Sequence, residues 1–151
     1  FFPRRVVFTT TPKNIYSLWP GVLVRVLGGI AIPENIAELK TFFDEMEFLL
    51  MRNYIVHFFP EGELKPYDTV LREFKKGAFY LAARARVPIV PMRITFESPK
   101  GLLKLIRKKP VMRLHIGKPI YPVATDLDTD FRLRMKAARE QMEDYKRTST
   151  R

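Results

Sequence analysis

The sequence predicts an α/β fold in which a mostly parallel sheet is flanked by helices. Short apolar runs that are typical of strands alternate with segments of helical periodicity along the chain. One run, Tyr54–Phe59, is almost continuously apolar, as expected for a parallel strand that is covered on both faces. We therefore expect this run to be the middle strand. The 151 residues suffice for one domain with a sizeable core, and we expect 1–151 to form a single domain.

The expected strands are short and rich in apolar side chains, and turns or helical segments bound them. The fourth overlaps the run Val87-Pro88-Ile89-Val90-Pro91, in which each proline removes a hydrogen-bond donor from the ladder. That strand should therefore lie at a sheet edge or begin irregularly. In chain order the five strands are Val6–Phe8, Ile30–Ile32, Tyr54–Phe59, Ile89–Phe96 and Val111–Ile116.

Three helices are expected between and after the strands. Asn35 and Glu38 have the spacing of a capping box and open the first helix. The second runs from about Phe74 to Ala85, and the third is a strongly charged C-terminal helix. The apolar stripe of the first helix comprises Ile36, Leu39, Phe43, Met46 and Leu50, and that of the third Phe131, Met135, Ala138, Met142 and Tyr145.

Composition narrows the classes of function. The 27 basic residues exceed the 16 acidic ones by 11, so we expect an anionic partner: nucleic acid, an anionic membrane leaflet or a phosphorylated substrate. The lack of cysteine excludes disulfides, thiolate catalysis and cysteine-based metal sites, and it suits a reducing compartment. No apolar run reaches the ~18 residues that span a bilayer. Because the first residue is Phe1 rather than Met, we expect a truncated chain, with any spanning segment upstream.

One segment has the composition of a membrane-surface element. Residues Lys100–Lys118 include seven basic and no acidic side chains, with leucine and isoleucine interleaved among them. A solvated loop between two strands explains this composition equally well. Tyr16 and Trp19, close to Pro20, are further candidates for a lipid interface, although aromatic side chains in such a helix more often belong to the core.

A candidate site follows directly after the predicted middle strand, where sites collect in α/β sheets. In the run Phe59-Pro60-Glu61-Gly62, proline fixes the backbone as it leaves the strand and glycine permits a tight turn. Glu61 would then project a carboxylate into the crevice at the edge of the sheet. An ordinary turn is the plainer interpretation of the same residues.

Basic residues gather downstream, at the predicted start of the second helix. Cationic side chains and free backbone N–H groups at a helix start together form a natural phosphate receptor. A solvated, lysine-rich helix start is the plainer alternative. The residues concerned are Arg72, Lys75, Lys76 and Gly77.

Taken in order, these pieces resemble the phospholipid/glycerol acyltransferase family over most of the chain. The family's third block, a Phe-Pro-Glu-Gly run, is similar to Phe59–Gly62, and its fourth, a Val-Pro-Ile-Val-Pro run, is identical to Val87–Pro91. Between them, Phe74–Ala78 resembles the family's usual link. The resemblance implies a glycerolipid acyltransferase-like α/β fold and one acyltransferase domain that lacks its N-terminal part.

Two departures from the family pattern concern binding. The family commonly has Thr-Arg after the third block, where this chain has Glu63-Leu64-Lys65, so Lys65 or Arg72 is expected to replace a phosphate-binding arginine. Gly29–Ile32 resembles the second block, but Pro33-Glu34-Asn35 follows in place of its arginine-containing end. We therefore assign no role to Glu34.

The family's catalytic signature, a His and an Asp separated by four residues, does not occur in these 151 residues. Gly62 stands five residues after His57, and Ile120 stands five residues after His115. Both histidines fall inside predicted strands, where we expect structural roles. Since the signature precedes the second block in the family, we expect it upstream of Phe1 and no catalytic residue within the chain.

The resemblance implies acyl transfer from acyl-CoA or acyl carrier protein to the lysophospholipid 1-acylglycerol-3-phosphate in phospholipid biosynthesis, with a histidine of pKa ~6.5 as general base and no metal or cofactor. Implied partners are the two substrates and an anionic membrane surface at the cytoplasmic face, with acyl carrier protein as a further candidate and no nucleic acid. Acceptor binding is assigned to Phe59, Pro60, Glu61, Gly62, Lys65, Arg72, Lys75, Lys76 and Gly77, and the acyl-donor side to Val87, Pro88, Ile89, Val90 and Pro91.

Two other classes of function are also compatible with the sequence. A catalytically inactive, membrane-bound homologue would have the same motifs without the histidine–aspartate pair. A basic nucleic-acid-binding module agrees with the net charge of +11. The sequence has no recognisable nucleic-acid motif and no aromatic platform among its basic residues, which weakens that alternative.

Overall fold

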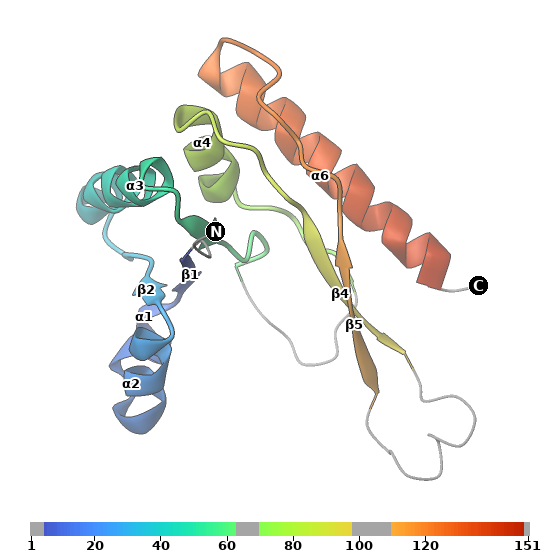
Figure 1. Cartoon of the computed structure of the whole chain (residues 1–151). Coiled ribbons are helices and arrows are strands. Elements are labelled where there is room, and N and C mark those ends of the chain that lie inside the picture. Colours follow the sequence, from blue (N-terminus) through green and yellow to red (C-terminus); the bar gives the residue numbers. More distant parts are fainter. Residues whose placement is uncertain (1–4, 63–69, 98–109, 150–151) are drawn as a thin grey trace.

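The computed structural model describes residues 5–62, 70–97 and 110–149 and confirms the α/β class (Figure 1). The chain forms a three-stranded parallel sheet, a two-stranded antiparallel sheet and flanking helices. The strands are β1 (Val6–Thr10), β2 (Gly29–Ala31), β3 (Ile55–His57), β4 (Met92–Glu97) and β5 (Val111–Ile116). The helices are α1 (Pro12–Tyr16), α2 (Leu18–Val26), α3 (Ile36–Met51), α4 (Gly77–Arg84) and α6 (Leu127–Ser149).

The middle strand of the parallel sheet is β1, which corrects the prediction made for residues 54–59. The strand order is β2-β1-β3, with Phe8 opposite Gly29 on one side and His57 on the other. Strand β3 has only three residues, and its Ile55 is 45% exposed. Strand order depends on pairing between distant segments, which the apolar character of one segment does not encode.

One helix begins where predicted, one contains its predicted apolar stripe, and one begins later than predicted. The side chain of Asn35 caps α3 by accepting a hydrogen bond from the backbone N–H of Ala37 at 3.0 Å. Helix α6 contains the whole predicted apolar stripe. Helix α4 begins at Gly77 rather than Phe74, and the residues before it are bound to the turn at Phe59–Gly62.

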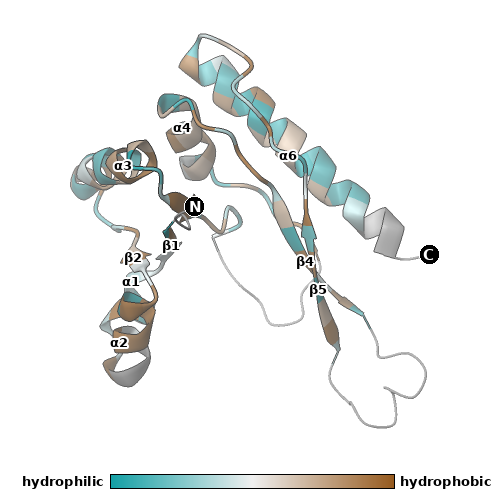
Figure 2. Ribbon diagram, in the orientation of Figure 1, coloured by the Kyte–Doolittle hydropathy of each residue, from teal (hydrophilic) through white to brown (hydrophobic). Residues whose placement is uncertain are grey.

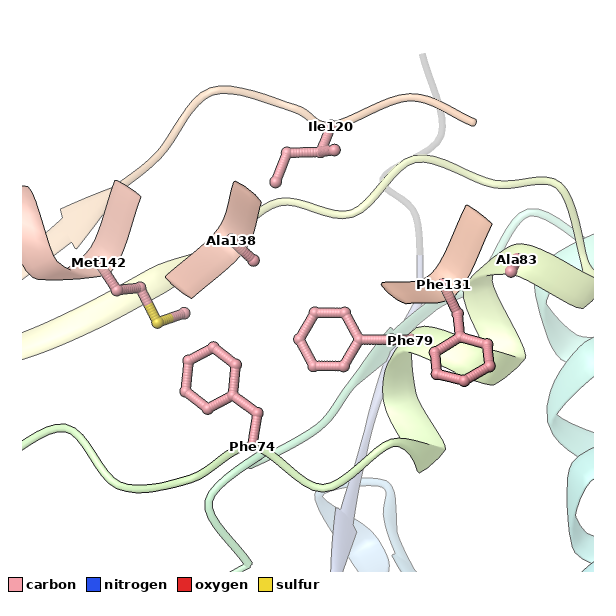
Figure 3. Close-up of a cluster of buried hydrophobic side chains, with 7 residues drawn as sticks. All are labelled: Phe74, Phe79, Ala83, Ile120, Phe131, Ala138 and Met142. Atoms are coloured by element: carbon pink, nitrogen blue, oxygen red, sulfur yellow. The ribbon is translucent and has the colours of Figure 1, made fainter. Parts of the chain in front are cut away.

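Helix α4 joins the two parts of the core. Its Leu81 packs with Phe42 and Met46 of α3 beneath the parallel sheet. Its opposite side packs against α6, and burying each aromatic ring there contributes roughly 1.5–3 kcal/mol. Figure 3 shows this second cluster, which comprises Phe74, Phe79, Ala83, Ile120, Phe131, Ala138 and Met142.

The hairpin β4–β5 turns a polar face towards α6 and an apolar face to solvent. Arg93 and Thr95 are buried, and the Arg93 guanidinium donates to the carbonyl of Met142 in α6. The other face has three directly opposed apolar pairs. Figure 2 shows the two strands of the hairpin beside α6. These pairs are Met92–Ile116, Ile94–Leu114 and Phe96–Met112, and the three β5 side chains are more than half exposed.

The predicted irregular start of the fourth strand is confirmed. Ile89 forms an isolated bridge with Ile120, and regular pairing begins only at Met92, after the second proline. No helix among the described residues has the length and apolar character needed to cross a membrane. Tyr16 is 77% exposed and therefore not part of the core. Of the basic segment 100–118, residues 100–109 lie outside the described residues.

Candidate functional site

The turn after β3 brings the first part of the candidate site together. The N–H of Gly62 donates to the carbonyl of Phe59 at 3.0 Å, which closes a tight turn. Gly62 has a φ of +73°, a conformation that favours glycine. The carbonyl of Pro60 accepts a hydrogen bond from the N–H of Lys75 at 2.8 Å. The predicted acceptor residues at 59–62 and at 72–75 are therefore adjacent in space.

The side chain of Glu61 also links the turn to the segment at residues 72–75. One of its carboxylate oxygens, Oε2, accepts a hydrogen bond from the backbone N–H of Arg72 at 3.3 Å, and the residue is half-buried. Glu61 thus holds the turn against the connection that leads to α4.

The side chain of Lys75 lies over Gly62. A Cβ atom built on Gly62 would lie 2.5 Å from Lys75 Cε and 2.6 Å from its Nζ, so the lack of a side chain at residue 62 makes room for the ammonium group. Lys75 and Lys76 are both exposed, and Gly77 then begins α4. This arrangement places positive charge beside the turn and at the start of a helix, as a phosphate site requires.

The predicted acyl-donor segment, Val87–Pro91, lies at the other end of α4. Helix α4 has 8 residues and is therefore about 12 Å long. Ile89 packs against the α4–α6 core, whereas Val90 is 45% exposed. The structure thus separates the predicted acyl-donor residues from the predicted acceptor residues by the length of one short helix.

Helix α6 contributes residues that the sequence interpretation missed. Arg134 Nη1 donates to the carbonyl of Val87 at 2.7 Å, and Arg139 Nη1 donates to the carbonyl of Arg72 at 3.3 Å. Each contact joins α6 to one segment of the candidate site. The available signal was the spacing of four between Asp130 and Arg134, which places an acid–base pair on one side of a helix that also carries an apolar stripe.

The pair Asp130–Arg134 is completely buried. Arg134 Nη2 lies 2.9 Å from Asp130 Oδ2, and the two side chains are 0% and 1% exposed. Burial raises the pKa of Asp130, but the N–H groups of Ala124 and Val123 and the charge of Arg134 outweigh burial and hold the pKa below its usual value. Burial lowers the pKa of the Arg134 guanidinium.

Both histidines contact nearby side chains. His57 lies edge-on to Phe59 with ring centroids 4.7 Å apart, and burial lowers its pKa, which favours the neutral imidazole. His115 Nε2 lies 2.8 Å from Thr95 Oγ1, and its ring stacks on Tyr145. These packed positions agree with structural roles for the two rings.

The remaining residues that the sequence analysis singled out are Glu34, Glu63 and Lys65. Lys65 and Glu63 lie outside the described residues, and Glu34 is exposed before α3. Across residues 5–62, 70–97 and 110–149, His, Asp and Glu side chains do not gather in groups of three or more that could hold a metal ion.

Comparison with known proteins places the chain among acyltransferases. Residues 1–95 match the family described as Acyltransferase. The chain is 35% identical over 93 residues to 1-acyl-sn-glycerol-3-phosphate acyltransferase beta of Homo sapiens, which is 60% of this chain and 33% of that protein. It is 39% identical over 85 residues to the chloroplastic 1-acyl-sn-glycerol-3-phosphate acyltransferase BAT2 of Brassica napus, 54% of this chain and 24% of that one. The matched region is thus about a third or less of these relatives.

A solved structure supports the fold over most of the chain. The crystal structure of the 1-acyl-sn-glycerophosphate (LPA) acyltransferase PlsC from Thermotoga maritima matches with a TM-score of 0.58 and 23% sequence identity. The match covers 93% of this chain and 56% of that chain. It therefore includes most of the residues after 95, where α6 lies.

Proposed function

This chain belongs to the Acyltransferase family, and from that membership we propose that the protein transfers a fatty acyl group from acyl-CoA or acyl carrier protein to a hydroxyl of 1-acylglycerol-3-phosphate. The main support is that the family match, residues 1–95, contains the turn at Phe59–Gly62 with Lys75 lying over it. Two relatives are named as 1-acyl-sn-glycerol-3-phosphate acyltransferases, which points to phospholipid biosynthesis.

In this proposal the phosphate of the acceptor binds beside the turn. Lys75 and Lys76 supply positive charge there, and the lack of a side chain at Gly62 leaves the space in which the Lys75 ammonium group lies. Glu61 acts through the Arg72 backbone. Its carboxylate holds the turn to residues 72–76, the cationic connection that leads to α4. The acyl chain of the donor lies along Val87–Pro91, where Ile89 is fixed in the core and Val90 is exposed.

The reaction moves one acyl group and one proton. The acceptor hydroxyl oxygen attacks the thioester carbonyl carbon, the carbon–sulfur bond breaks, and the proton of the hydroxyl passes through a general base to the leaving thiol. Neither His57 nor His115 has an aspartate five residues later, so we assign the base to no residue of this chain. The residues described here bind and orient the substrates.

We also propose that the protein works at the cytoplasmic face of a membrane. The basic excess of 11 charges favours contact with anionic lipid. The proposed acceptor is itself a lysophospholipid, and the proposed donor carries a fatty acyl chain. Flotation of the full protein with anionic vesicles at low salt tests this directly. A protein that stays in the soluble fraction with such vesicles would contradict the location.

The test of function is an acyl-transfer assay on the full protein with radiolabelled acyl-CoA. We expect product with 1-acylglycerol-3-phosphate, and a loss of about 10-fold or more in kcat/KM when Lys75→Met or Lys76→Ala removes a cation. The matched control is Lys136→Ala, because Lys136 lies on the exposed side of α6. Unchanged transfer in Glu61→Gln and Lys76→Ala would reject the site, and binding to substrate-containing vesicles without turnover would indicate an inactive homologue.

A further inference from the structure

Two arginines of α6 bind backbone carbonyls in the two segments of the candidate site, residues 72–76 and 87–91. Both arginines lie outside the residues that match the family. Residues 1–95 match the family, whereas α6 spans Leu127–Ser149. Arg134 donates to the carbonyl of Val87 at 2.7 Å, and Arg139 donates to the carbonyl of Arg72 at 3.3 Å. One helix thus contacts the start of the acyl-donor segment and the start of the cationic connection.

The Val87–Pro91 segment depends on such a contact because it has few backbone donors of its own. Pro88 and Pro91 have no N–H, so the segment cannot make a continuous ladder. Its backbone bonds are the paired bonds between Ile89 and Ile120, at 2.9 and 2.8 Å, and one bond at each end. The N–H of Val87 donates to the carbonyl of Ala82 at 3.1 Å, and the carbonyl of Pro91 accepts from the N–H of Gly117 at 2.8 Å. The fully buried Arg134 guanidinium adds a charged donor to the carbonyl at the start of the segment.

Arg134 is itself held in place from the other side. Its partner Asp130 accepts hydrogen bonds from the N–H groups of Val123 at 2.7 Å and Ala124 at 3.0 Å. The carbonyl of Ala124 accepts from Arg86 Nη1 at 2.7 Å, one residue before Val87. The guanidinium therefore has a fixed position relative to the backbone that it supports.

Arg139 completes a chain of contacts on the acceptor side. Its guanidinium lies 5.8 Å from the centre of the Phe74 ring, and its Nε lies 2.9 Å from Glu143 Oε1. The peptide groups of Arg72 are thereby held at both ends, by Glu61 at the N–H and by Arg139 at the carbonyl. This connection continues to Lys75, whose N–H is bound to Pro60.

We propose that Arg134 and Arg139 are positioning residues of the acyltransferase site, Arg134 for the acyl-donor segment and Arg139 for the acceptor segment. Both act through backbone carbonyls and not by touching substrate. The proposal rests on the proposed function for its kinetic consequences, while its structural core concerns only the backbone at residues 72–75 and 87–91. Helix α6 is accordingly part of the substrate-binding unit.

Amide hydrogen exchange on the full protein tests the separation between the two arginines. In Arg139→Met we expect exchange to become faster at the amides of Arg72 and Lys75 and to stay unchanged at Ile89 and Ile120. In Arg134→Lys we expect the opposite pattern. General destabilisation would accelerate exchange at all four amides together, and that result, or no change in either variant, would overturn the proposal.

Kinetics with both substrates gives the second readout. We expect Arg139→Met to raise the KM for 1-acylglycerol-3-phosphate by about 3- to 10-fold with little change in the KM for acyl-CoA, and Arg134→Lys to do the reverse. Glu143→Gln keeps Arg139 but removes its ion pair, so the acceptor KM should rise less than in Arg139→Met. Equal changes in both KM values would contradict the assignment.

The exchange and kinetic experiments distinguish failure of the proposed function from failure of the positioning role. If the wild-type protein shows no acyl transfer, the proposed function fails, while the exchange pattern still decides whether each arginine holds its own segment. If Arg134→Lys does not fold, Arg139→Met carries the test alone, because Arg139 is partly exposed and its stem can be replaced by methionine. Arg132→Met, on the solvent side of α6, should match the wild type in both measurements.

Discussion

The turn Phe59–Gly62 and the run Val87–Pro91 are two short segments at opposite ends of α4, but different forces hold them. The turn is fixed by local geometry: a positive φ at Gly62, a bond within the turn, and backbone bonds to a segment nearby in sequence. The proline-containing run has backbone bonds to Ile120 and Gly117, and a buried guanidinium 47 residues away adds a charged donor. The first should therefore be sensitive to changes in shape, and the second to changes in charge.

The largest effect should follow from breaking the buried pair. Arg134→Met leaves the Asp130 carboxylate buried without its cation, so we expect the free energy of unfolding to fall by about 3–5 kcal/mol. Urea denaturation followed by circular dichroism measures this loss. Arg132→Met removes an ion pair of the same spacing on the exposed side of α6, so it should leave the urea midpoint almost unchanged. Similar losses in both variants would show that burial does not distinguish the two pairs.

A smaller effect is expected from a change of shape in the turn. Gly62→Ala puts a Cβ within 2.6 Å of Lys75 Nζ and forces alanine to a φ of +73°, which costs roughly 1–2 kcal/mol. The matched control is Gly77→Ala, whose Cβ would lie 3.5 Å from Phe43 Cζ in ordinary contact. Thermal unfolding of both variants compares them. A Gly77→Ala protein less stable than Gly62→Ala would contradict this account of the turn.

The smallest effect is a change of stability with pH, confined to acid, that comes from the titration of Asp130. Its folded pKa lies below its unfolded value near ~3.9, so its stabilisation is fully present above about pH 4 and is lost as the pH falls through the folded pKa. We expect the free energy of unfolding to decline below that pH and the decline to be shallower in Asp130→Asn. Asp126, whose pKa the Thr129 N–H lowers, keeps part of the slope in that variant. Urea titrations at a series of pH values measure both slopes, and identical slopes would exclude Asp130 as a source.

The fold was predictable wherever local pattern decides it. The capping residue Asn35, the stripe on α6 and the strand Val111–Ile116 all follow from side-chain spacing within one segment. The order of the parallel strands was not predictable, because β1 pairs with segments about 20 and 50 residues later in the chain. The sequence of β3 alone does not exclude the middle position for that strand. Local propensity also cannot show that the residues just before Gly77 bind the turn instead of beginning the helix.

The candidate site was predictable in its parts but not in its supports. The run Phe59–Gly62 and the lysines near Gly77 could be found as motifs, and the structure brings them together. The contacts of Arg134 and Arg139 could not be predicted, because an arginine that binds a distant carbonyl has no sequence pattern beyond its position on the helix. The contact of Glu61 with the Arg72 N–H belongs to the same class of long-range detail.

The outward apolar face of the β4–β5 hairpin has a practical consequence for handling the chain. Met112, Leu114 and Ile116 lie in a row with their partners on β4, and strands with such a face associate readily in water. A basic surface keeps molecules apart by repulsion, and added salt screens that repulsion within about 10 Å at 0.1 M. Preparations of these residues should therefore stay dispersed best at low ionic strength or in mild detergent, and salting them for purification should promote precipitation.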